Sequence, residues 1–214
     1  QTGATINGYI NDEPIGAFFM KEFIGIGADG RNIFTDVVAD GESLDNDRII
    51  AGSALPDILY AFYLKFNYKD FDLGFNFNGV SGNKIYNHTA MSLFSRGQLA
   101  RSLNTTPFAV EFDNEIDTNS NEVSTRYLED GSFLRLNNAT LGYTLRAENV
   151  GLGDWVNSLR LTLTGQNLFV ISDYSGFDPE GNTGATIDGI QTFGIDRFTY
   201  PSPRTLLVGL NVKF

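Results

Sequence analysis

The sequence predicts an all-β chain whose antiparallel strands form part of a transmembrane β-barrel. Three observations carry this prediction: apolar residues alternate with polar ones over membrane-spanning lengths, short connections alternate with long ones, and the chain ends on an aromatic residue. The last segment, TLLVGLNVKF, has an apolar side chain at every second position from Leu206 to Phe214. A tilted transmembrane strand needs about 9–11 residues, which this segment supplies. A soluble β-sandwich strand alternates in the same way, so the tail alone does not separate the two classes.

Other segments repeat this alternation. The expected strands cover residues 15–26, 59–68, 71–79, 132–145, 158–169 and 204–214. The first alternates less clearly than the others, whereas 158–169 opens with three leucines on one side and Arg160 on the other. Repetition at membrane-spanning length favours the barrel over the sandwich.

The clearest pair is a hairpin within residues 59–79. If Lys69 and Asp70 form a two-residue turn, Tyr68 faces Phe71 and the pairing continues along both strands. One face of the hairpin is then wholly apolar and the other is polar and partly charged. A slip of one residue would mix the two faces, so the register is well specified.

Residues 132–145 alternate in two halves. Apolar side chains stand at even positions at Leu134 and Leu136, and at odd positions from Ala139 onward. The change falls at Asn137-Asn138 and predicts a β-bulge there.

The connections between the expected strands are long, very short, long, medium and long in chain order. Outer-membrane barrels have short periplasmic turns and long extracellular loops, which places Phe214 on the periplasmic side. The medium connection holds the single tryptophan, Trp155. We expect it either in an interfacial aromatic belt or packed on its own small turn.

Composition excludes several other classes. The chain has no cysteine, so it has neither disulfides nor cysteine-based metal sites, and its net charge of −11 argues against nucleic acid as a partner. No apolar run approaches the length of a transmembrane helix, which leaves a barrel as the way for this chain to cross a bilayer. No hydrolase elbow, phosphate loop or H-E-x-x-H motif occurs, so we expect no enzyme. No secretory signal begins at Gln1, so we expect export to be specified elsewhere or its signal to have been removed.

The expected strands are too few for a closed barrel. Common barrels have at least about eight strands, and an open set would leave two unpaired edges in lipid. We therefore expect the remaining strands in the rest of a longer chain or in another chain.

Several motifs in order resemble the SusC/RagA family of TonB-dependent outer-membrane transporters. The C-terminal signature is carried by YLEDGSFLRLNNATLGYTL (127–145), LRLTLTGQNLFVISDYSGFDPE (159–180) and GIDRFTYPSPRTLLVGLNVKF (194–214). Upstream, EPIGAFF (13–19), DGESLDNDRIIAGSALP (40–56) and YKDFDLGFNFNGVSGNKIYN (68–87) resemble the family in the same order. The resemblance implies a barrel of about 22 strands. Residues 1–214 would be its C-terminal part, with about six strands, and the plug domain and earlier strands would be absent from this chain.

The resemblance also implies a function, a location and partners. It implies import of a bulky nutrient, an oligosaccharide or a peptide, through the outer membrane of a Gram-negative bacterium of Bacteroidota type. The partners would be the remaining barrel and plug, a SusD-like surface lipoprotein, TonB acting through the missing N-terminal region, and membrane lipid. Two alternatives remain: an outer-membrane adhesin or structural barrel without a plug, and a soluble β-sandwich carbohydrate-binding module.

Two sets of residues are candidates for contact with a transported molecule. Tyr86, Tyr174 and Phe177 lie in or beside long loops, where their rings could stack on a sugar, although loop packing explains them more simply. The predicted barrel lumen is lined by Lys65, Asn67, Asp72, Asn76, Arg135 and Arg160. These could line a polar passage, or they could simply be hydrated inside the barrel.

A third candidate is a calcium loop. Asp36, Asp40, Gly41 and Asp47 match its positions 1, 5, 6 and 12, but Val38 stands where an oxygen ligand is expected. The incomplete set favours a solvated acidic turn over bound calcium, and we expect no other cofactor.

The single histidine, His88, falls in an expected extracellular loop. Without a cysteine or a second histidine it makes a poor metal site, so we expect a surface role.

Overall fold

The computed structural model describes most of the 214-residue chain. The described residues are 6–8, 10–42, 46–93, 95–100, 106–146, 151, 155–182, 186–187 and 190–214. They divide into two compact units. The loop unit comprises Gln1–Asp57, Gly82–Ser132 and Asp173–Pro201, and the sheet unit comprises Ile58–Ser81, Phe133–Ser172 and Ser202–Phe214.

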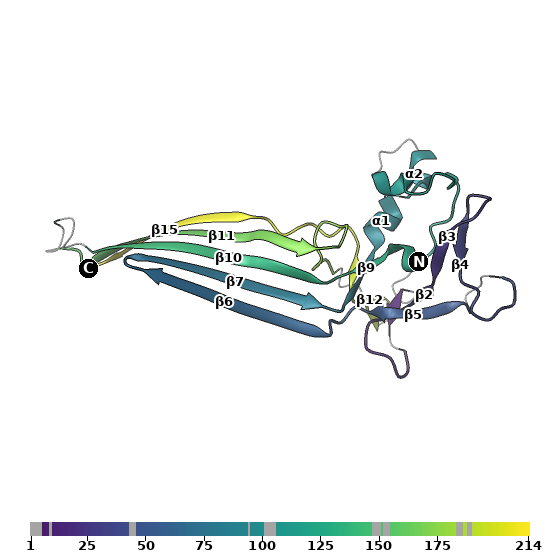
Figure 1. Cartoon of the computed structure of the whole chain (residues 1–214), viewed down its shortest axis with the longest axis horizontal. Coiled ribbons are helices and arrows are strands. Elements are labelled where there is room, and N and C mark those ends of the chain that lie inside the picture. The colour runs from purple at the N-terminus through teal and green to yellow at the C-terminus, as the bar shows by residue number, and fades with distance from the viewer. Residues whose placement is uncertain are drawn as a thin grey trace. The chain divides into compact units, whose positions relative to one another are not determined.

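The sheet unit is one antiparallel sheet of five strands in the order β15-β11-β10-β7-β6 (Figure 1). The strands are β6 (Ile58–Tyr68), β7 (Phe71–Ser81), β10 (Phe133–Arg146), β11 (Ser158–Ser172) and β15 (Thr205–Lys213). Strands that follow one another within this unit are neighbours in the sheet, which is the order of up-and-down barrels. The shortest has 9 residues and the longest 15, lengths that suit a tilted membrane crossing.

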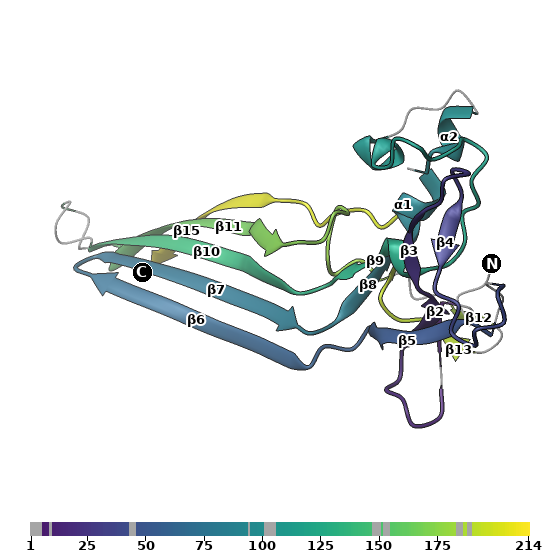
Figure 2. The same cartoon turned by 45° about the vertical axis from the view of Figure 1, so that its right-hand side comes forward.

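The neighbouring strands β6 and β7 form a hairpin (Figure 2), and its register is the predicted one. Tyr68 is opposite Phe71, and Phe62 is opposite Phe77, with their ring centroids 4.7 Å apart. Lys69 opens the turn with φ 52°, the left-handed conformation that two-residue hairpin turns use. The alternation of side chains thus specified the pairing although the turn lacks the favoured Asn-Gly sequence.

The predicted bulge is confirmed in β10. Its pairing with both β7 and β11 shifts between Leu136 and Asn138. On β11, Asn167 has φ 51°, and the side chain of Leu168 lies 2.6 Å from the place a β-carbon on Gly165 would take. Gly165 therefore leaves space for the irregularity beside the bulge.

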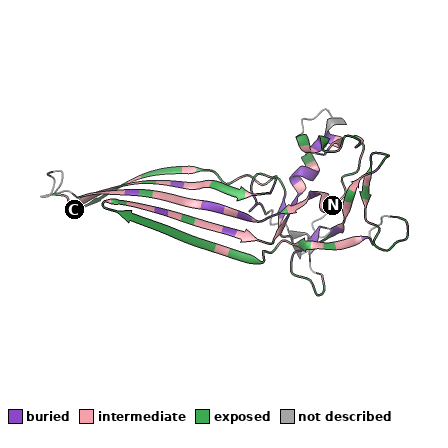
Figure 3. Ribbon diagram, in the orientation of Figure 1, coloured by how far each residue is buried: buried purple, intermediate pink, exposed green. Residues whose placement is uncertain are grey.

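The register gives the sheet two unlike faces. The apolar face includes Leu64, Phe66, Leu73, Phe75, Leu141, Leu163, Val208 and Leu210. Figure 3 shows β6 exposed over nearly all its length, and on β15 the side chain of Val208 is 76% exposed. The sheet unit by itself therefore presents a wide apolar surface.

The predicted strand 15–26 is wrong. These residues form two short strands, β2 (Ala17–Lys21) and β3 (Phe23–Ile26), which belong to different small sheets of the loop unit. Phe18 and Phe19 are adjacent apolar residues, so the period of two fails, and Phe18 is buried in the core of the loop unit. The described residues therefore form five long strands in one sheet, where about six were expected.

The loop unit consists of short elements around its own core. Its sheets are β1-β2-β5, β14-β8-β9, β3-β4 and β12-β13. Its remaining strands are β1 (Asn7–Gly8), β4 (Asn32–Phe34), β5 (Arg48–Ser53), β8 (Lys84–Asn87), β9 (Leu128–Asp130), β12 (Thr186–Ile187), β13 (Ile190–Gln191) and β14 (Ile195–Asp196). Its helices are α1 (His88–Leu93) and α2 (Gly97–Ala100), with 3₁₀ turns η2 (Pro107–Val110) and η3 (Thr125–Tyr127). The core holds Ile6, Phe18, Met20, Tyr86, Ala90, Met91, Val123, Tyr127 and Ile195.

Within the described residues, no helix is both long enough and apolar enough to cross a membrane.

The connections of the sheet follow the predicted alternation. Residues 82–132 join β7 to β10, and residues 173–204 join β11 to β15. Because the strands are antiparallel, the strand ends that these long connections join lie at the same end of the sheet as the start of β6. The turn 69–70, the end of β10 and the start of β11 lie at the other end.

Candidate functional site

The residues predicted to line the barrel lumen share the polar face of the sheet unit. They are Lys65, Asn67, Asp72, Asn76, Arg135 and Arg160. Asn67 is directly opposite Asp72, and Lys65 and Asn76 are exposed on the same face. The grouping follows from the register, and the passage that this face would line stays a prediction.

Asp72 and Arg160 form a bidentate ion pair on this face. Arg160 Nη1 lies 2.6 Å from Asp72 Oδ1, and Nη2 lies 2.7 Å from Oδ2. The pair reaches from β7 to β11 across β10, where a β-carbon on Gly142 would come within 2.6 Å of both partners. The glycine thus leaves room for a close cross-strand pair, whose planar fork geometry fixes both side chains.

Arg135 differs from the other cations of this face because it is buried. Its guanidinium lies 5.7 Å from the ring centroid of Phe133. A cation over an aromatic face is stabilised electrostatically, and more strongly when water is excluded. This contact describes the packing of Arg135 and does not test its predicted place in a lumen.

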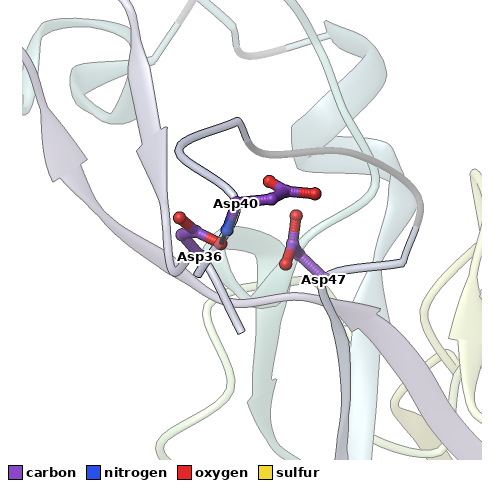
Figure 4. A group of neighbouring side chains, drawn as sticks. All are labelled: Asp36, Asp40 and Asp47. Atoms are coloured by element: carbon purple, nitrogen blue, oxygen red, sulfur yellow. Dashed lines mark hydrogen bonds between the residues drawn. The ribbon is translucent and has the colours of Figure 1, made fainter. Parts of the chain in front are cut away.

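The acidic residues of the predicted calcium loop come together in the loop unit (Figure 4). One carboxylate oxygen from each of Asp36, Asp40 and Asp47 lies within 4.8 Å of the others. Asp47 is fully buried, and its Oδ1 accepts hydrogen bonds from the backbone amides of Val37 at 2.8 Å and Val38 at 3.1 Å. Asp47, at the last position of the loop, therefore fixes the backbone at Val38, the third position.

The loop is also held by Asp36. Its two carboxylate oxygens accept hydrogen bonds from the amides of Asp40 at 3.3 Å and Gly41 at 2.8 Å, and Gly41 has φ 87°. Three carboxylates are suitable but incomplete ligands for calcium, which takes 6–8 oxygens. Backbone amides also stabilise carboxylates without a cation. The preference for a solvated acidic turn over bound calcium therefore stays a prediction.

The aromatic residues predicted to contact substrate have different environments. Tyr86 is 0% exposed, and its hydroxyl donates a hydrogen bond to Met91 Sδ at 3.0 Å. Burial raises the pKa of Tyr86. The ring presents no surface to a ligand in this structure, so packing in the core of the loop unit accounts for the position of Tyr86.

Tyr174 is also buried, whereas Phe177 is 66% exposed. The Tyr174 hydroxyl donates to Asp196 Oδ2 at 2.6 Å, and burial together with this carboxylate raises its pKa. Of the predicted aromatic contacts, Phe177 alone therefore offers a largely exposed ring.

His88 and Trp155 also differ in exposure. His88 begins α1, where Nδ1 lies 3.0 Å from Ser92 Oγ and the ring meets Phe198 edge-on. His88 is half-buried, and burial together with the nearby positive charge of Arg197 lowers the pKa of its imidazole. Trp155 is 84% exposed, and its place in an interfacial belt stays a prediction.

Sequence reasoning missed a buried ion pair in the loop unit. Arg126 Nη1 and Nη2 each lie 2.8 Å from an oxygen of Glu115, and both side chains are 4% exposed. Burial alone would raise the pKa of Glu115, but hydrogen bonds from Arg126 and Asn119 outweigh it and lower that pKa. The guanidinium also lies 5.2–5.9 Å from the ring centroids of Phe23, Phe108, Phe112 and Tyr127. No periodic pattern links residues that are 11 positions apart in irregular segments, so the sequence held no signal for this pair.

The chain is similar in sequence to several TonB-dependent receptors, although no protein-family model matches it. TonB-dependent receptor P3 of Formosa agariphila is 31% identical over 231 residues, covering 94% of this chain and 22% of the relative. TonB-dependent receptor P26 of the same organism is 34% identical over 197 residues, covering 85% of this chain and 19% of the relative. TonB-dependent receptor SusC of Bacteroides thetaiotaomicron is 30% identical over 196 residues, covering 86% of this chain and 18% of the relative.

Solved structures agree at the level of the fold. A chain of the RagAB peptide transporter matches with a TM-score of 0.77 and 24% identity, covering 92% of this chain and 22% of that chain. A chain of the RagAB peptide importer in its open-open state matches with a TM-score of 0.75 and 24% identity, covering 100% of this chain and 25% of that chain. The relatives are receptors and transporters rather than enzymes, in agreement with the prediction. The chain is therefore homologous to one segment of the SusC/RagA-family TonB-dependent receptors and spans about a fifth of their length.

Proposed function

We propose that this chain is part of an outer-membrane transporter that imports a bulky nutrient, an oligosaccharide or a peptide, in a TonB-dependent manner. The observation that carries the proposal is the five-stranded meander with one exposed apolar face and one polar face. Lipid would cover the apolar face, and water or the transported molecule would meet the polar one. Homology to TonB-dependent receptors supports the same assignment.

Residues 1–214 would then be the C-terminal part of a barrel of about 22 strands, whose plug and earlier strands lie outside this sequence. β6 and β15, the two edge strands of the sheet, would pair with strands of the remaining barrel, because unpaired backbone groups are costly in lipid. The short turn 69–70 would face the periplasm and the long connections the cell exterior.

The partners of this transporter would be a SusD-like surface lipoprotein over its mouth and TonB on the periplasmic side. The similarity of this chain to a chain of the RagAB peptide transporter supports a place in such a transporter. The polar residues of the sheet, with the pair of Asp72 and Arg160, would line part of the passage. Phe177 would be the exposed aromatic residue available to the nutrient.

Uptake in living cells tests the proposal. Cells of a Bacteroidota host that depend on the complete protein containing this chain would be given fluorescent oligosaccharides and peptides, with and without functional TonB. We expect one class to enter only when both the protein and TonB are present. Uptake that is unchanged without TonB, or recovery of the protein outside the outer-membrane fraction, would contradict the proposal.

A further inference from the structure

Polar side chains from separate segments of the loop unit meet in one hydrogen-bond network. The segments are the end of β8 with the start of α1, the strand β9, residues 173–180 and the strand β14. Each carries part of a motif described in the sequence, namely KIYN (84–87), LED (128–130), DYSGFDPE (173–180) and GID (194–196). The two long connections of the sheet are therefore joined by side chains as well as by the pairing of β14 with β8.

Glu129 of β9 is at the centre of this network. Its Oε1 accepts hydrogen bonds from Asn87 Nδ2 at 2.8 Å and Ser175 Oγ at 2.7 Å, and its Oε2 accepts one from the backbone amide of Ser175 at 2.6 Å. Asn87 is 2% exposed, and its Oδ1 accepts a hydrogen bond from the amide of Ala90 in α1 at 2.8 Å. All these groups donate to Glu129, so a carboxylate, which only accepts when ionised, satisfies them together. Glu129, Asn87 and Ser175 thus form a latch between the two connections.

A second carboxylate holds the residue before Ser175. The Tyr174 hydroxyl donates to Asp196 Oδ2 at 2.6 Å, and both side chains are buried. Asp196 is paired with Asn87 in the parallel register of β14 and β8, and its carbonyl accepts a hydrogen bond from Thr89 Oγ1 at 3.3 Å. The adjacent residues Tyr174 and Ser175 are therefore attached to two different strands of the loop unit.

Phe177 follows this attached turn and is 66% exposed. The residues on either side of it, Tyr174 and Asp178, are buried. A β-carbon on Gly176 would collide with the ring of Tyr174, and Asp178 Oδ1 accepts a hydrogen bond from the amide of Glu180 at 3.0 Å. An exposed ring between fixed neighbours loses little conformational freedom when it binds.

We propose that Glu129 is a positioning residue, which fixes residues 173–180 on β9 and so presents Phe177 as a preorganised contact for the nutrient. The inference rests on the proposed function for the role of Phe177, whereas the latch is a property of the loop unit itself. Glutamine at position 129 would keep the size of the side chain but place an amide nitrogen against one of the donors. The pairing of β14 with β8 does not involve the Glu129 side chain, so the loosening is expected to be local.

Hydrogen exchange followed by mass spectrometry tests the latch on the complete protein containing this chain, purified in detergent. We expect Glu129→Gln to speed exchange in peptides covering residues 173–180 by about tenfold and to leave residues 84–87 as protected as in the wild type. Ser175→Ala, which removes the hydroxyl and keeps the backbone amide, should give a smaller increase. Glu13→Gln, the same change at an exposed position of the loop unit, is the control. Unchanged exchange at 173–180 in Glu129→Gln, or lost protection throughout the loop unit, overturns the inference.

The concentration dependence of uptake tests the role of Phe177. We expect Phe177→Ala to raise the KM for uptake about tenfold with the maximal rate near that of the wild type, and Glu129→Gln to raise it less. The double variant should be no worse than Phe177→Ala, because both changes act through the same ring. Additive effects on KM, or a fall in the maximal rate alone, would contradict this role of Glu129.

The two measurements distinguish failure of the latch from failure of the proposed function. Faster exchange at residues 173–180 in a protein without TonB-dependent uptake supports the latch and removes the transport function. TonB-dependent uptake with the same KM in wild type, Glu129→Gln and Phe177→Ala leaves the transport function standing and overturns the positioning role of Glu129.

Discussion

At the scale of single residues, the loop unit contains a buried, bidentate ion pair. Arg126 and Glu115 meet through two hydrogen bonds of 2.8 Å, and Asn119 Nδ2 donates a further one to Glu115 at 2.8 Å. Aromatic rings surround the guanidinium. Burying two charges costs free energy that only such geometry offsets, so the loss of one partner leaves the other uncompensated.

Replacing this cation tests that dependence. We expect Arg126→Met to lower the free energy of unfolding of the loop unit by about 3–5 kcal/mol, because Glu115 stays buried without its partner. The effect is measured by chemical denaturation, with protease sensitivity of the loop unit as the readout of unfolding. Arg31→Met, which removes an exposed pair with Asp29, is the control and is expected to cost less than about 1 kcal/mol. Similar stability of the two variants would contradict this account.

The same pair predicts a dependence of stability on pH. The pKa of Glu115 is lower in the folded protein than its usual value, so its contribution is present above the usual pKa. That contribution is lost as pH falls through the lowered folded value. We expect the loop unit to lose stability in this acidic range, and Glu115→Gln to flatten the loss, in denaturation curves recorded at several pH values. Parallel curves for the two proteins would argue against it.

The acidic loop yields a prediction about calcium. Because Asp36 and Asp47 already accept backbone amides, we expect the melting temperature to be unchanged by added calcium or by a chelator. Differential scanning fluorimetry on the detergent-solubilised protein measures it. A rise in melting temperature with calcium that disappears in Asp40→Asn would establish a calcium site instead.

At the scale of the elements, local periodicity predicted the sheet and failed in the loop unit. The β6–β7 register and the bulge beside Asn138 could be predicted because a period of two constrains every neighbour along a strand. Residues 15–26 were misassigned because short strands in an irregular unit are shaped by packing around buried residues such as Phe18. Pattern alone therefore separates long strands from loops but does not resolve short ones.

Neighbouring residues of β15 test the two faces. Val208 lies on the apolar face and Leu207 on the polar face. We expect Val208→Arg to reduce the folded protein in the outer membrane, because a lipid-facing arginine near the bilayer midplane costs about 2–4 kcal/mol. Leu207→Arg, the matched control, should assemble normally. Heat-modifiable migration on gels reports folding, and equal migration and yield would contradict the assignment of the faces.

At the scale of the whole molecule, the sheet has two edge strands, β6 and β15, and an exposed apolar face. Hydrogen bonding along an antiparallel sheet ends at such edges unless further strands continue it. This chain spans about a fifth of the length of its relatives. Proteins of the relatives' length have enough further residues to supply strands that would continue the sheet.

Residues 1–214 produced alone should therefore aggregate without detergent. Uncovered apolar surface and unpaired edges both favour association. Size-exclusion chromatography with and without detergent measures this behaviour. A monodisperse, soluble species of 23.6 kDa would favour the alternative of a β-sandwich carbohydrate-binding module.

The amino-acid sequence by itself determined the strands of the sheet unit, the register of the β6–β7 hairpin, the bulge and the division into an apolar and a polar face. These features depend on the alternation of side chains along each strand, which can be recognised from residues that are adjacent in the sequence. The tertiary structure alone decided the burial of Tyr86, the pairing of Arg126 with Glu115 and the contact of Glu129 with Ser175. Each of these depends on contacts between irregular segments far apart in the chain, which no local period encodes.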